Sequence, residues 1–341
     1  MDARELERLR HKYQDAKGDD VFDPTFQQVT ALLYQGRGNR KLPFAGLPTL
    51  LDAPYAEDLT GLDVALIGVP MDLGVTNRPG ARFGPRAVRD IERIGPYHHQ
   101  LKVAPSTMLQ VADVGDVPLR SRYSLEQSIE DIEAFFHRVH DAHVVPLAVG
   151  GDHSITYPIL KALGRDTPVG LVHIDAHCDT GGEHDGSKFH HGGPFRQAVL
   201  AGVLDPKRSI QIGIRGAAEI FWEFSYDAGM TVLHIEDVMR LGIEAIIEQA
   251  REVVGTGPVY VSFDVDGLDP AYAPGTGTPE VGGLTPREAQ QLLRGLHGLS
   301  IIGGDVVEIA PQYDPTTNTV QAGAQMLFEM LCLTALRPSA S

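Results

Sequence analysis

Short apolar runs recur along most of the chain, and most are followed by a segment with the spacing of an amphipathic helix. The runs predict strands at residues 64–69, 109–114, 144–149, from 169, 210–214, 231–235, 258–263 and 301–308. Most runs are almost continuously apolar, which is typical of strands covered on both faces. We therefore predict an α/β protein with three α/β/α layers and a central, mainly parallel sheet of about eight strands.

The segments between the runs predict the covering helices. A loop rich in glycine and proline, residues 70–85, leads to a predicted helix at about residues 86–94. Ser124 begins Ser-Leu-Glu-Gln, a capping pattern that predicts a helix ending near residue 142. Other helices are expected before residue 163 and at about 194–201 and 319–336. In such a fold, ligands bind beyond the carboxyl ends of the strands.

Residues 1–62 differ from the rest and are predicted to be an N-terminal extension. Residues 2–17 are charged and weakly helical, and turn-forming residues interrupt the remainder of the extension, namely Pro24, Gly36, Gly38, Pro43, Gly46, Pro48 and Pro54. Because such a segment buries little by itself, we expect it to pack on a neighbouring subunit, with disorder as the alternative. No repeat or Ser/Pro-rich linker divides the rest of the chain, so residues 63–341 are predicted to form a single domain.

Composition narrows the partners and the compartment. The formal charge of −16 argues against nucleic acid and favours a cationic small molecule, although simple solubility explains the charge equally well. Two cysteines, Cys178 and Cys332, exclude a disulfide scaffold and fit a reducing cytoplasm. Neither a secretory segment nor an apolar run of roughly 18 residues is evident, so we expect a cytoplasmic protein without a membrane partner.

Candidate metal ligands cluster after three predicted strands. They are two imidazoles and four carboxylates: His153, Asp175, His177, Asp179, Asp264 and Asp266. Carboxylates two residues apart repel each other, and burying them together is costly without a cation. Together these groups form a nitrogen and oxygen ligand set for two divalent ions, which lie about 3.5–4 Å apart in such centres.

The ligand chemistry points to hydrolysis but does not choose the metal. Without thiolates, Mn, Ni, Co and Zn all remain candidates. A water that bridges two ions is largely hydroxide near neutral pH, because metal binding can lower its pKa from about 15.7 to about 7. His153 taken alone would more simply be a hydrogen-bonded core or cap residue, and Asp269 before Pro270 is expected to build a turn.

Three motifs occur in a fixed order: Gly150-Gly-Asp-His-Ser, Asp175-Ala-His-x-Asp and Ser262-Phe-Asp-x-Asp-x-x-Asp-Pro. With these motifs the chain resembles the ureohydrolase family, the arginases and agmatinases, over about residues 64–336. The resemblance implies an arginase-like fold and a binuclear centre whose bridging hydroxide attacks a guanidino C–N bond to give urea and an amine or ammonia. By matching position, one ion would take His153, Asp175, Asp179 and Asp264, and the other Asp175, His177, Asp264 and Asp266, with Asp175 and Asp264 bridging.

The resemblance also assigns residues on the substrate side. The catalytic His-Gly of the family corresponds to His191-Gly192, and His191 would pass a proton to the departing amine. The glutamate after the last strand corresponds to Glu308, which would bind the guanidinium at two points. His190 is expected to be structural. Agmatinases usually have threonine after His-Gly, whereas Gly193 here would widen the substrate pocket or free the loop.

The segment at residues 188–195, with the long extension, looks most like the branch that hydrolyses guanidine, alkylguanidines or biguanides such as metformin. That likeness implies nickel as the favoured metal, with manganese as the alternative. It also implies a homo-oligomer, a trimer or hexamer, or pairing with a related subunit. Agmatine and guanidinobutyrate are the alternative substrates. Arginase activity is disfavoured, because no cluster for an α-carboxylate and an α-amine is evident.

Two other classes of function compete with an active ureohydrolase. A subunit that only stabilises an active paralogue would be free to lose its ligands, whereas this chain has the full set. A deacetylase-type hydrolase on a related fold would need one metal and a tyrosine or histidine electrophile, whereas six ligands suit two ions.

Overall fold

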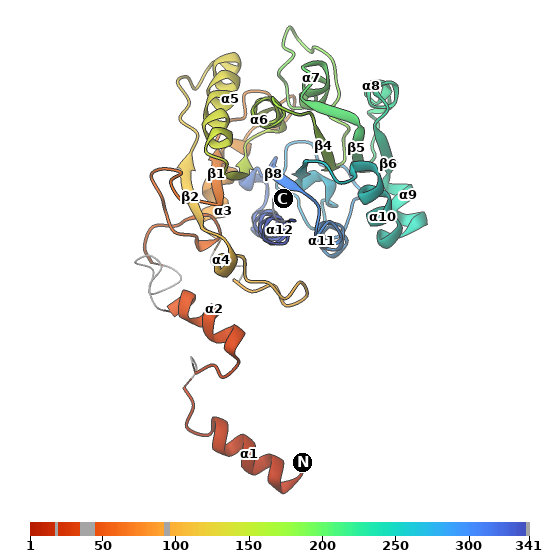
Figure 1. Cartoon of the computed structure of the whole chain (residues 1–341). Coiled ribbons are helices and arrows are strands. Elements are labelled where there is room, and N and C mark those ends of the chain that lie inside the picture. Colours follow the sequence, from red (N-terminus) through yellow and green to blue (C-terminus); the bar gives the residue numbers. More distant parts are fainter. Residues whose placement is uncertain (18–19, 35–44, 92–95, 339–341) are drawn as a thin grey trace. The chain divides into compact units, whose positions relative to one another are not determined.

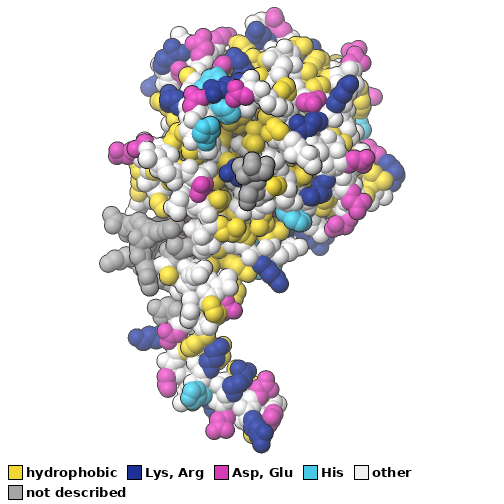
Figure 2. Space-filling view, in the orientation of Figure 1, with side chains coloured by type: hydrophobic (Ala, Val, Ile, Leu, Met, Phe, Trp, Pro, Cys, Tyr) yellow, Lys and Arg dark blue, Asp and Glu magenta, His cyan; other side chains and the backbone are white. Residues whose placement is uncertain are grey.

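The computed structural model describes residues 1–17, 20–34, 45–91 and 96–338 (Figure 1). The chain divides into two units, Met1–Leu47 and Pro48–Ser341. The first contains helices α1 (Ala3–Tyr13) and α2 (Pro24–Tyr34). None of the residues of α1 is buried, and Figure 2 shows basic and acidic side chains over its visible face.

Helix α2 differs from the expectation that the extension is broken by turn formers. Pro24 is its first residue, a position where a missing N–H and a fixed φ do no harm. The Asp23 carboxylate accepts hydrogen bonds from the backbone N–H groups of Thr25 and Phe26 at 2.9 and 3.2 Å, which caps the helix. Of the other turn formers named above, Gly36, Gly38 and Pro43 lie outside the described residues.

The second unit is built on one eight-stranded parallel sheet, and its strand order is β2-β1-β3-β8-β7-β4-β5-β6. The strands are β1 (Val64–Val69), β2 (Val111–Asp116), β3 (Val145–Gly150), β4 (Val169–Ile174), β5 (Leu204–Ile214), β6 (Thr231–His234), β7 (Val259–Asp264) and β8 (Ile301–Val307). Every residue of β1, β3, β4 and β7 is buried. Continuous apolar runs therefore belong to strands that are covered on both faces, as predicted.

Helices cover both faces of this sheet, and Figure 1 shows the three layers. The helices of the second unit are α3 (Gly84–Arg89), α4 (Pro105–Met108), α5 (Leu125–Asp141), α6 (Thr156–Leu163), α7 (Pro194–Leu200), α8 (Glu223–Ala228), α9 (Ile235–Leu241), α10 (Ile243–Val254), α11 (Pro286–Gly295) and α12 (Asn318–Ala335). One apolar core joins α5, α6 and α7 to the sheet, and a second core joins α9, α10, α11 and α12 to it. No described helix is both long and apolar enough to cross a membrane.

The predicted α/β/α architecture is confirmed, and the differences are at element ends. Strand β5 begins at Leu204, well before the predicted residue 210, because the sequence Asp-Pro-Lys-Arg at residues 205–208 conceals its start. Helix α3 ends at Arg89, and most of the predicted remainder lies outside the described residues.

The strand order determines where the site forms. Strands β3, β8, β7 and β4 are consecutive neighbours in the middle of the sheet. Because all of them are parallel, their carboxyl ends meet at one edge. A side chain at Gly151, just beyond β3, would overlap the carbonyl oxygen of Met71, so only glycine permits the turn after this strand. This turn places His153 over the edge where β4 and β7 also end.

Candidate metal centre and active site

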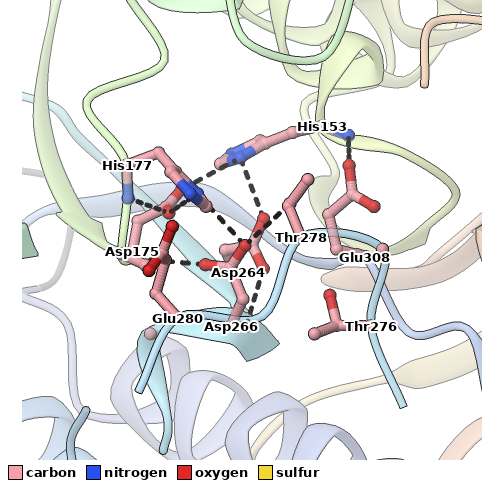
Figure 3. Close-up of polar contacts among 12 residues, drawn as sticks. His153, Asp175, His177, Asp264, Asp266, Thr276, Thr278, Glu280 and Glu308 are labelled. Atoms are coloured by element: carbon pink, nitrogen blue, oxygen red, sulfur yellow. Dashed lines mark hydrogen bonds and ion pairs between the residues drawn. The ribbon is translucent and has the colours of Figure 1, made fainter. Parts of the chain in front are cut away.

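His153 lies at the centre of the first cluster of candidate ligands (Figure 3). It opens the 3₁₀ turn η3 (His153–Ile155), and it is fully buried. Its Nδ1 atom is 3.2 Å from Asp175 Oδ2, 2.8 Å from Asp179 Oδ2 and 3.3 Å from Asp264 Oδ2. None of these contacts has hydrogen-bond geometry, and Nδ1 has no hydrogen-bond partner among the described residues.

The spacing of these donors matches the coordination sphere of a metal ion. Two donors at right angles around an ion, each about 2.1 Å from it, lie about 3 Å apart. The Nδ1 atom of His153 faces three carboxylates at this spacing without a hydrogen bond, so the four side chains are arranged to share a cation. The first cluster therefore fits a divalent ion.

The second cluster consists of Asp175, His177 and Asp266. His177 Nδ1 is 3.4 Å from Asp175 Oδ1 and 3.2 Å from Asp266 Oδ2, and one donor atom from each residue lies within 4.8 Å of the others. The Thr278 hydroxyl donates to Asp266 Oδ2 at 3.2 Å and orients this carboxylate. Because Asp175 belongs to both clusters, the structure brings the six candidate ligands into two adjoining sites. All of them except Asp179 are labelled in Figure 3.

Crowding changes how readily these carboxylates ionise. Burial and the charges of Asp266 and Asp175 raise the pKa of Asp264 well above its ordinary value. Burial and Asp175 raise the pKa of Asp266 to about 6. Burial acts in the same direction on Asp175, but His173 and His153 outweigh it and hold the pKa of Asp175 well below the ordinary range. Two divalent cations would relieve the repulsion among these acids, which is an electrostatic reason why the site fits metal.

His191 and Glu308 form a separate pair beside the clusters. Glu308 Oε1 accepts hydrogen bonds from the His153 backbone N–H at 3.0 Å and from His191 Nδ1 at 2.8 Å. The other ring nitrogen, His191 Nε2, accepts from the backbone N–H of Thr76 at 3.2 Å and lies 2.7 Å from its hydroxyl. Because the Thr76 N–H requires an acceptor, the hydrogen-bond network assigns the proton of the neutral ring to Nδ1, facing Glu308.

The second carboxylate oxygen of Glu308 has no hydrogen-bond partner in the described part of the chain. Glu308 is 1% exposed, and its Oε2 atom is buried without a hydrogen bond from any described residue. An unpaired buried carboxylate oxygen is costly, so the site is prepared for a donor that comes from elsewhere. A Cβ at Gly277 would lie 3.6 Å from Oε2, so glycine leaves room beside this oxygen. A guanidinium offers the planar N–H donors that such a carboxylate accepts.

The Glu308 carboxylate also controls the charge of His191. Burial disfavours the charged imidazole, but the neighbouring Glu308 outweighs burial and raises the pKa of His191 to about 9. The ring is therefore set to carry a second proton at neutral pH, on Nε2. In that state Nε2 no longer accepts from the Thr76 N–H and donates to the Thr76 hydroxyl instead. A protonated imidazole beside the site can give a proton to a departing amine, which is the chemistry predicted for it.

Two site residues adopt a backbone conformation that L-residues rarely take. Asp179 has a φ of 51° and Glu308 a φ of 63°. Left-handed conformations cost about 1 kcal/mol or more for residues other than glycine and persist where the surroundings enforce them. Both residues direct a carboxylate into the site, so this conformation is part of how the two carboxylates are aimed.

Known proteins provide an independent comparison. Residues 62–332 match the arginase family. The chain belongs to that family. It is 50% identical over 296 residues to the guanidinopropionase of Pseudomonas aeruginosa, which covers 86% of this chain and 93% of the relative. Over 292 residues it is 47% identical to the mitochondrial agmatinase of Gallus gallus, with 84% and 86% covered. The solved proclavaminate amidino hydrolase from Streptomyces clavuligerus matches with a TM-score of 0.83 at 35% identity, covering 86% of this chain and 99% of that one.

Membership of the arginase family confirms the predicted family, fold and class of reaction. Arginase-family enzymes use a pair of divalent metal ions, and the relatives named above are hydrolases of guanidino C–N bonds. The protein is therefore a hydrolase of this class. The individual ligand roles, the nickel preference, the metformin-type substrate, the oligomer and the cytoplasmic location stay predictions.

Gly193, where this chain departs from the agmatinase pattern, lies at the start of α7. A Cβ there would lie 3.1 Å from the carbonyl oxygen of Gly181 and 3.3 Å from His190 Nε2. A side chain at position 193 would therefore point toward Gly181 and His190, and the close packing around His190 explains why glycine is present. His190 Nε2 is 2.5 Å from the carbonyl oxygen of Gly182, which suits the structural role expected of this histidine.

Sequence reasoning missed the side chains that support the candidate ligands. Buried His173 contacts Asp175 Oδ2 through Nε2 at 2.6 Å, and its Nδ1 accepts a hydrogen bond from the Gln211 amide at 3.0 Å. Both ring nitrogens are thereby engaged, so His173 orients a ligand although its donor atoms lie close enough to join the first cluster. The signal was available, because His173 lies in β4 two residues before Asp175, which directly follows that strand, and alternate residues of an extended segment face the same side.

Proposed function

We propose that this arginase-family protein hydrolyses a small guanidino compound to urea and an amine at two divalent metal ions. The observation that carries the proposal is the buried Nδ1 atom of His153, which faces three carboxylates at 2.8–3.3 Å without a hydrogen bond. One protein ligand set of this kind, joined to a second through Asp175, supports a pair of ions. When bound, the ions would supply a water of lowered pKa as the nucleophile.

The groups of the chain itself have complementary roles. Glu308 binds the guanidinium through its unpartnered Oε2 atom and fixes the plane of the substrate. His191, held between Glu308 and Thr76, donates a proton to the amine as the C–N bond breaks. His153, Asp175, Asp179 and Asp264 would hold one ion, and His177 and Asp266 would complete the other.

The substrate proposal follows the relatives in part. A guanidino acid of short chain is the first candidate, because the 50% identical relative is named guanidinopropionase. Guanidine, alkylguanidines and metformin, predicted from the loop at residues 188–195, and also agmatine and guanidinobutyrate, are the compounds against which it must be compared. The net charge of −16 favours a cationic substrate over a guanidino acid, whose own charges cancel.

The proposals for the metal and the assembly follow from the donor set and from the first unit. A set of four carboxylates and two imidazoles suits manganese as well as the nickel implied by the resemblance. The described part of the first unit exposes Leu6, Tyr13, Phe22 and Phe26 by 37–49%. Such side chains are suited to pack on another subunit, so we propose that the extension contributes to a homo-oligomer.

The deciding experiment measures urea release from all six candidate substrates with the purified single chain, loaded separately with manganese and nickel. Elemental analysis should give about two ions per chain. We expect turnover of guanidinopropionate, and a Glu308→Gln variant should lose it while retaining both ions. Two ions with no urea from any guanidino compound would contradict the proposed reaction. Activity that requires a second, related chain would instead favour the paired-subunit alternative.

A further inference from the structure

The two candidate ion sites rest on different parts of the fold. The first support is a series of hydrogen-bonded, buried side chains that runs from His153 through β7 to β8. The second is a single buried arginine that donates hydrogen bonds to several carbonyl groups, including that of Asp266. Neither support includes a candidate ligand donor atom. Ser262 begins the third motif, but no role has been given to it so far, and Asp305 and Arg215 lie outside the three motifs.

The first support fixes which nitrogen of His153 is free. His153 Nε2 is 2.8 Å from the Ser262 hydroxyl, and this hydroxyl donates its one proton to Asp305 Oδ1 at 2.7 Å. Ser262 must therefore accept from His153, so the imidazole proton is on Nε2. The lone pair is left on Nδ1, the atom that faces the three carboxylates.

Asp305 is itself held as an acceptor. Its Oδ2 atom receives the Thr156 hydroxyl at 2.6 Å and the Tyr260 hydroxyl at 2.8 Å, and all these side chains are fully buried. Ser262 and Asp305 are paired residues of β7 and β8. Three hydroxyl groups donate to this one carboxylate, so Asp305 acts only as an acceptor and each hydrogen bond from His153 through Ser262 points toward it.

The second support is Arg215, just beyond β5. Arg215 is 5% exposed, and its guanidinium donates to the carbonyl oxygens of five residues: Gly213, Asp266, Gly267, Leu268 and Glu280. Its shortest bond, at 2.6 Å, is to the backbone of Asp266. The arginine thus fixes the 3₁₀ turn η5 (Val265–Gly267), from which the Asp266 carboxylate reaches toward His177. A side chain at Gly283 would overlap the guanidinium, so glycine is required there.

We propose that Ser262 and Asp305 are positioning residues for the first ion and Arg215 is the positioning residue for the second, so that each ion can be weakened separately. The inference rests on the proposed metal centre. Groups of this kind are worth about 10–100-fold in metal affinity. Lysine cannot replace Arg215, because one ammonium cannot reach carbonyls spread over a planar fork.

The test is a calorimetric titration of metal-free protein with manganese, with His153→Ala and His177→Ala identifying the two binding steps. Ser262→Ala should weaken the step lost in His153→Ala by about 10–100-fold and leave the other within about threefold. Arg215→Lys should do the reverse. Tyr260→Phe is the matched control, because it removes a donor to Asp305 without interrupting the path from His153. Ser262→Thr restores the hydroxyl and should restore affinity.

The outcomes separate the inference from the proposed function. If wild type binds fewer than two ions, the metal centre is wrong and the inference fails with it. If wild type binds two ions and Ser262→Ala or Arg215→Lys weakens both steps equally, or neither, only the separate supports are disproved. Thermal unfolding of each metal-free variant shows whether it is folded, and should Arg215→Lys not fold, the Ser262→Ala and Ser262→Thr pair alone decides.

Discussion

The metal-ligand clusters and the His191–Glu308 pair lie side by side but are built in opposite ways. In the clusters, like charges crowd together, and His153 Nδ1 has no hydrogen-bond partner among the described residues. In the pair, the imidazole and carboxylate satisfy each other, and Thr76 satisfies the second ring nitrogen. Within the pair, only Glu308 Oε2 lacks a hydrogen-bond partner among the described residues, and it is free to accept from a substrate. We therefore expect the clusters to depend on bound cations, whereas the hydrogen bonds within the pair are already formed in the protein alone.

This difference predicts two distinct effects of a substitution on metal content and activity. A change in the clusters should remove metal and activity together. A change in the pair should remove activity and leave the metal content unchanged. Elemental analysis alongside kinetics is thus the measurement that sharpens the comparison.

The largest effect is expected from Asp264→Asn. Two bound ions are worth several kcal/mol of transition-state stabilisation, so kcat should fall about 10³-fold or more as metal is lost. Asp185→Asn is the control, because that side chain is 93% exposed in the neighbouring loop. Retention of both ions and activity in Asp264→Asn would contradict the assignment of this residue.

The same substitution should act in the opposite direction on the stability of the metal-free protein. The folded-state pKa of Asp264 is raised, so its contribution to stability is present at acid pH and is lost as pH rises through that pKa. Asparagine cannot ionise, so metal-free Asp264→Asn should unfold at a higher temperature than metal-free wild type at pH 7. Calorimetry at pH 4 and pH 7 checks this, because the advantage should shrink at pH 4.

Glu308→Gln tests the other half of the comparison. The free Oε2 atom has two lone pairs and can accept two N–H groups of a guanidinium. Two such hydrogen bonds from a charged donor are worth about 3–6 kcal/mol together, so kcat/KM should fall by about 10²–10⁴-fold. The amide oxygen can still accept from the His153 backbone, so the fold around the clusters is preserved. Both ions should remain, and a loss of metal would show that Glu308 belongs to the clusters instead.

His191→Asn should lower kcat by about 10²-fold, the usual value of a positioned general acid. In wild type, activity should decline on the alkaline side as His191 loses the proton that its pKa of about 9 allows it to hold. The variant should lack this alkaline limb. A pH–rate profile of each protein, with metal content measured at every pH, distinguishes loss of the acid from loss of the ions.

The sequence was sufficient for the layers, the parallel sheet and the six clustered donors, because each follows from an apolar run and the polar residues at its end. It could not give the left-handed backbone of Asp179 and Glu308, since both conformations are imposed by tertiary contacts. The contact between His191 and Thr76 could not be predicted for a similar reason. Thr76 is 115 positions away, in a loop whose path no local pattern specifies.

The residues that position the candidate ligands were missed, because none of them is conspicuous in the sequence when taken alone. Ser262 and Asp305 look like ordinary polar residues within buried strands, and only the pairing of β7 with β8 places them opposite each other. Arg215 follows a strand without any acidic residue next to it, because its acceptors are carbonyl groups. A buried polar residue in the middle of an apolar run is the signal that sequence reasoning should have used.

A smaller effect concerns the charge of His191 in the metal-free protein. Because its folded-state pKa is raised, His191 contributes stability below about pH 6.5, and this contribution is lost as pH rises through about 9. Its upper limit is about 3 kcal/mol. In Glu308→Gln the carboxylate charge is gone, so the pKa should fall toward 6.5 and the loss of stability between pH 7 and pH 9 should shrink. NMR titration of the ring and denaturant unfolding at both pH values measure the two quantities.

The smallest effect is expected at Thr76, where the pair meets the loop before α3. Its backbone N–H contacts His191 Nε2 whatever the side chain is, so Thr76→Val should remove only the hydroxyl contact at 2.7 Å. A hydrogen bond of this kind is worth about 1 kcal/mol, which corresponds to a roughly fivefold lower kcat. Thr76→Ser keeps the hydroxyl and should retain most of the activity. Equal losses in both variants would show that the methyl group and loop packing, not the hydroxyl, hold His191 in place.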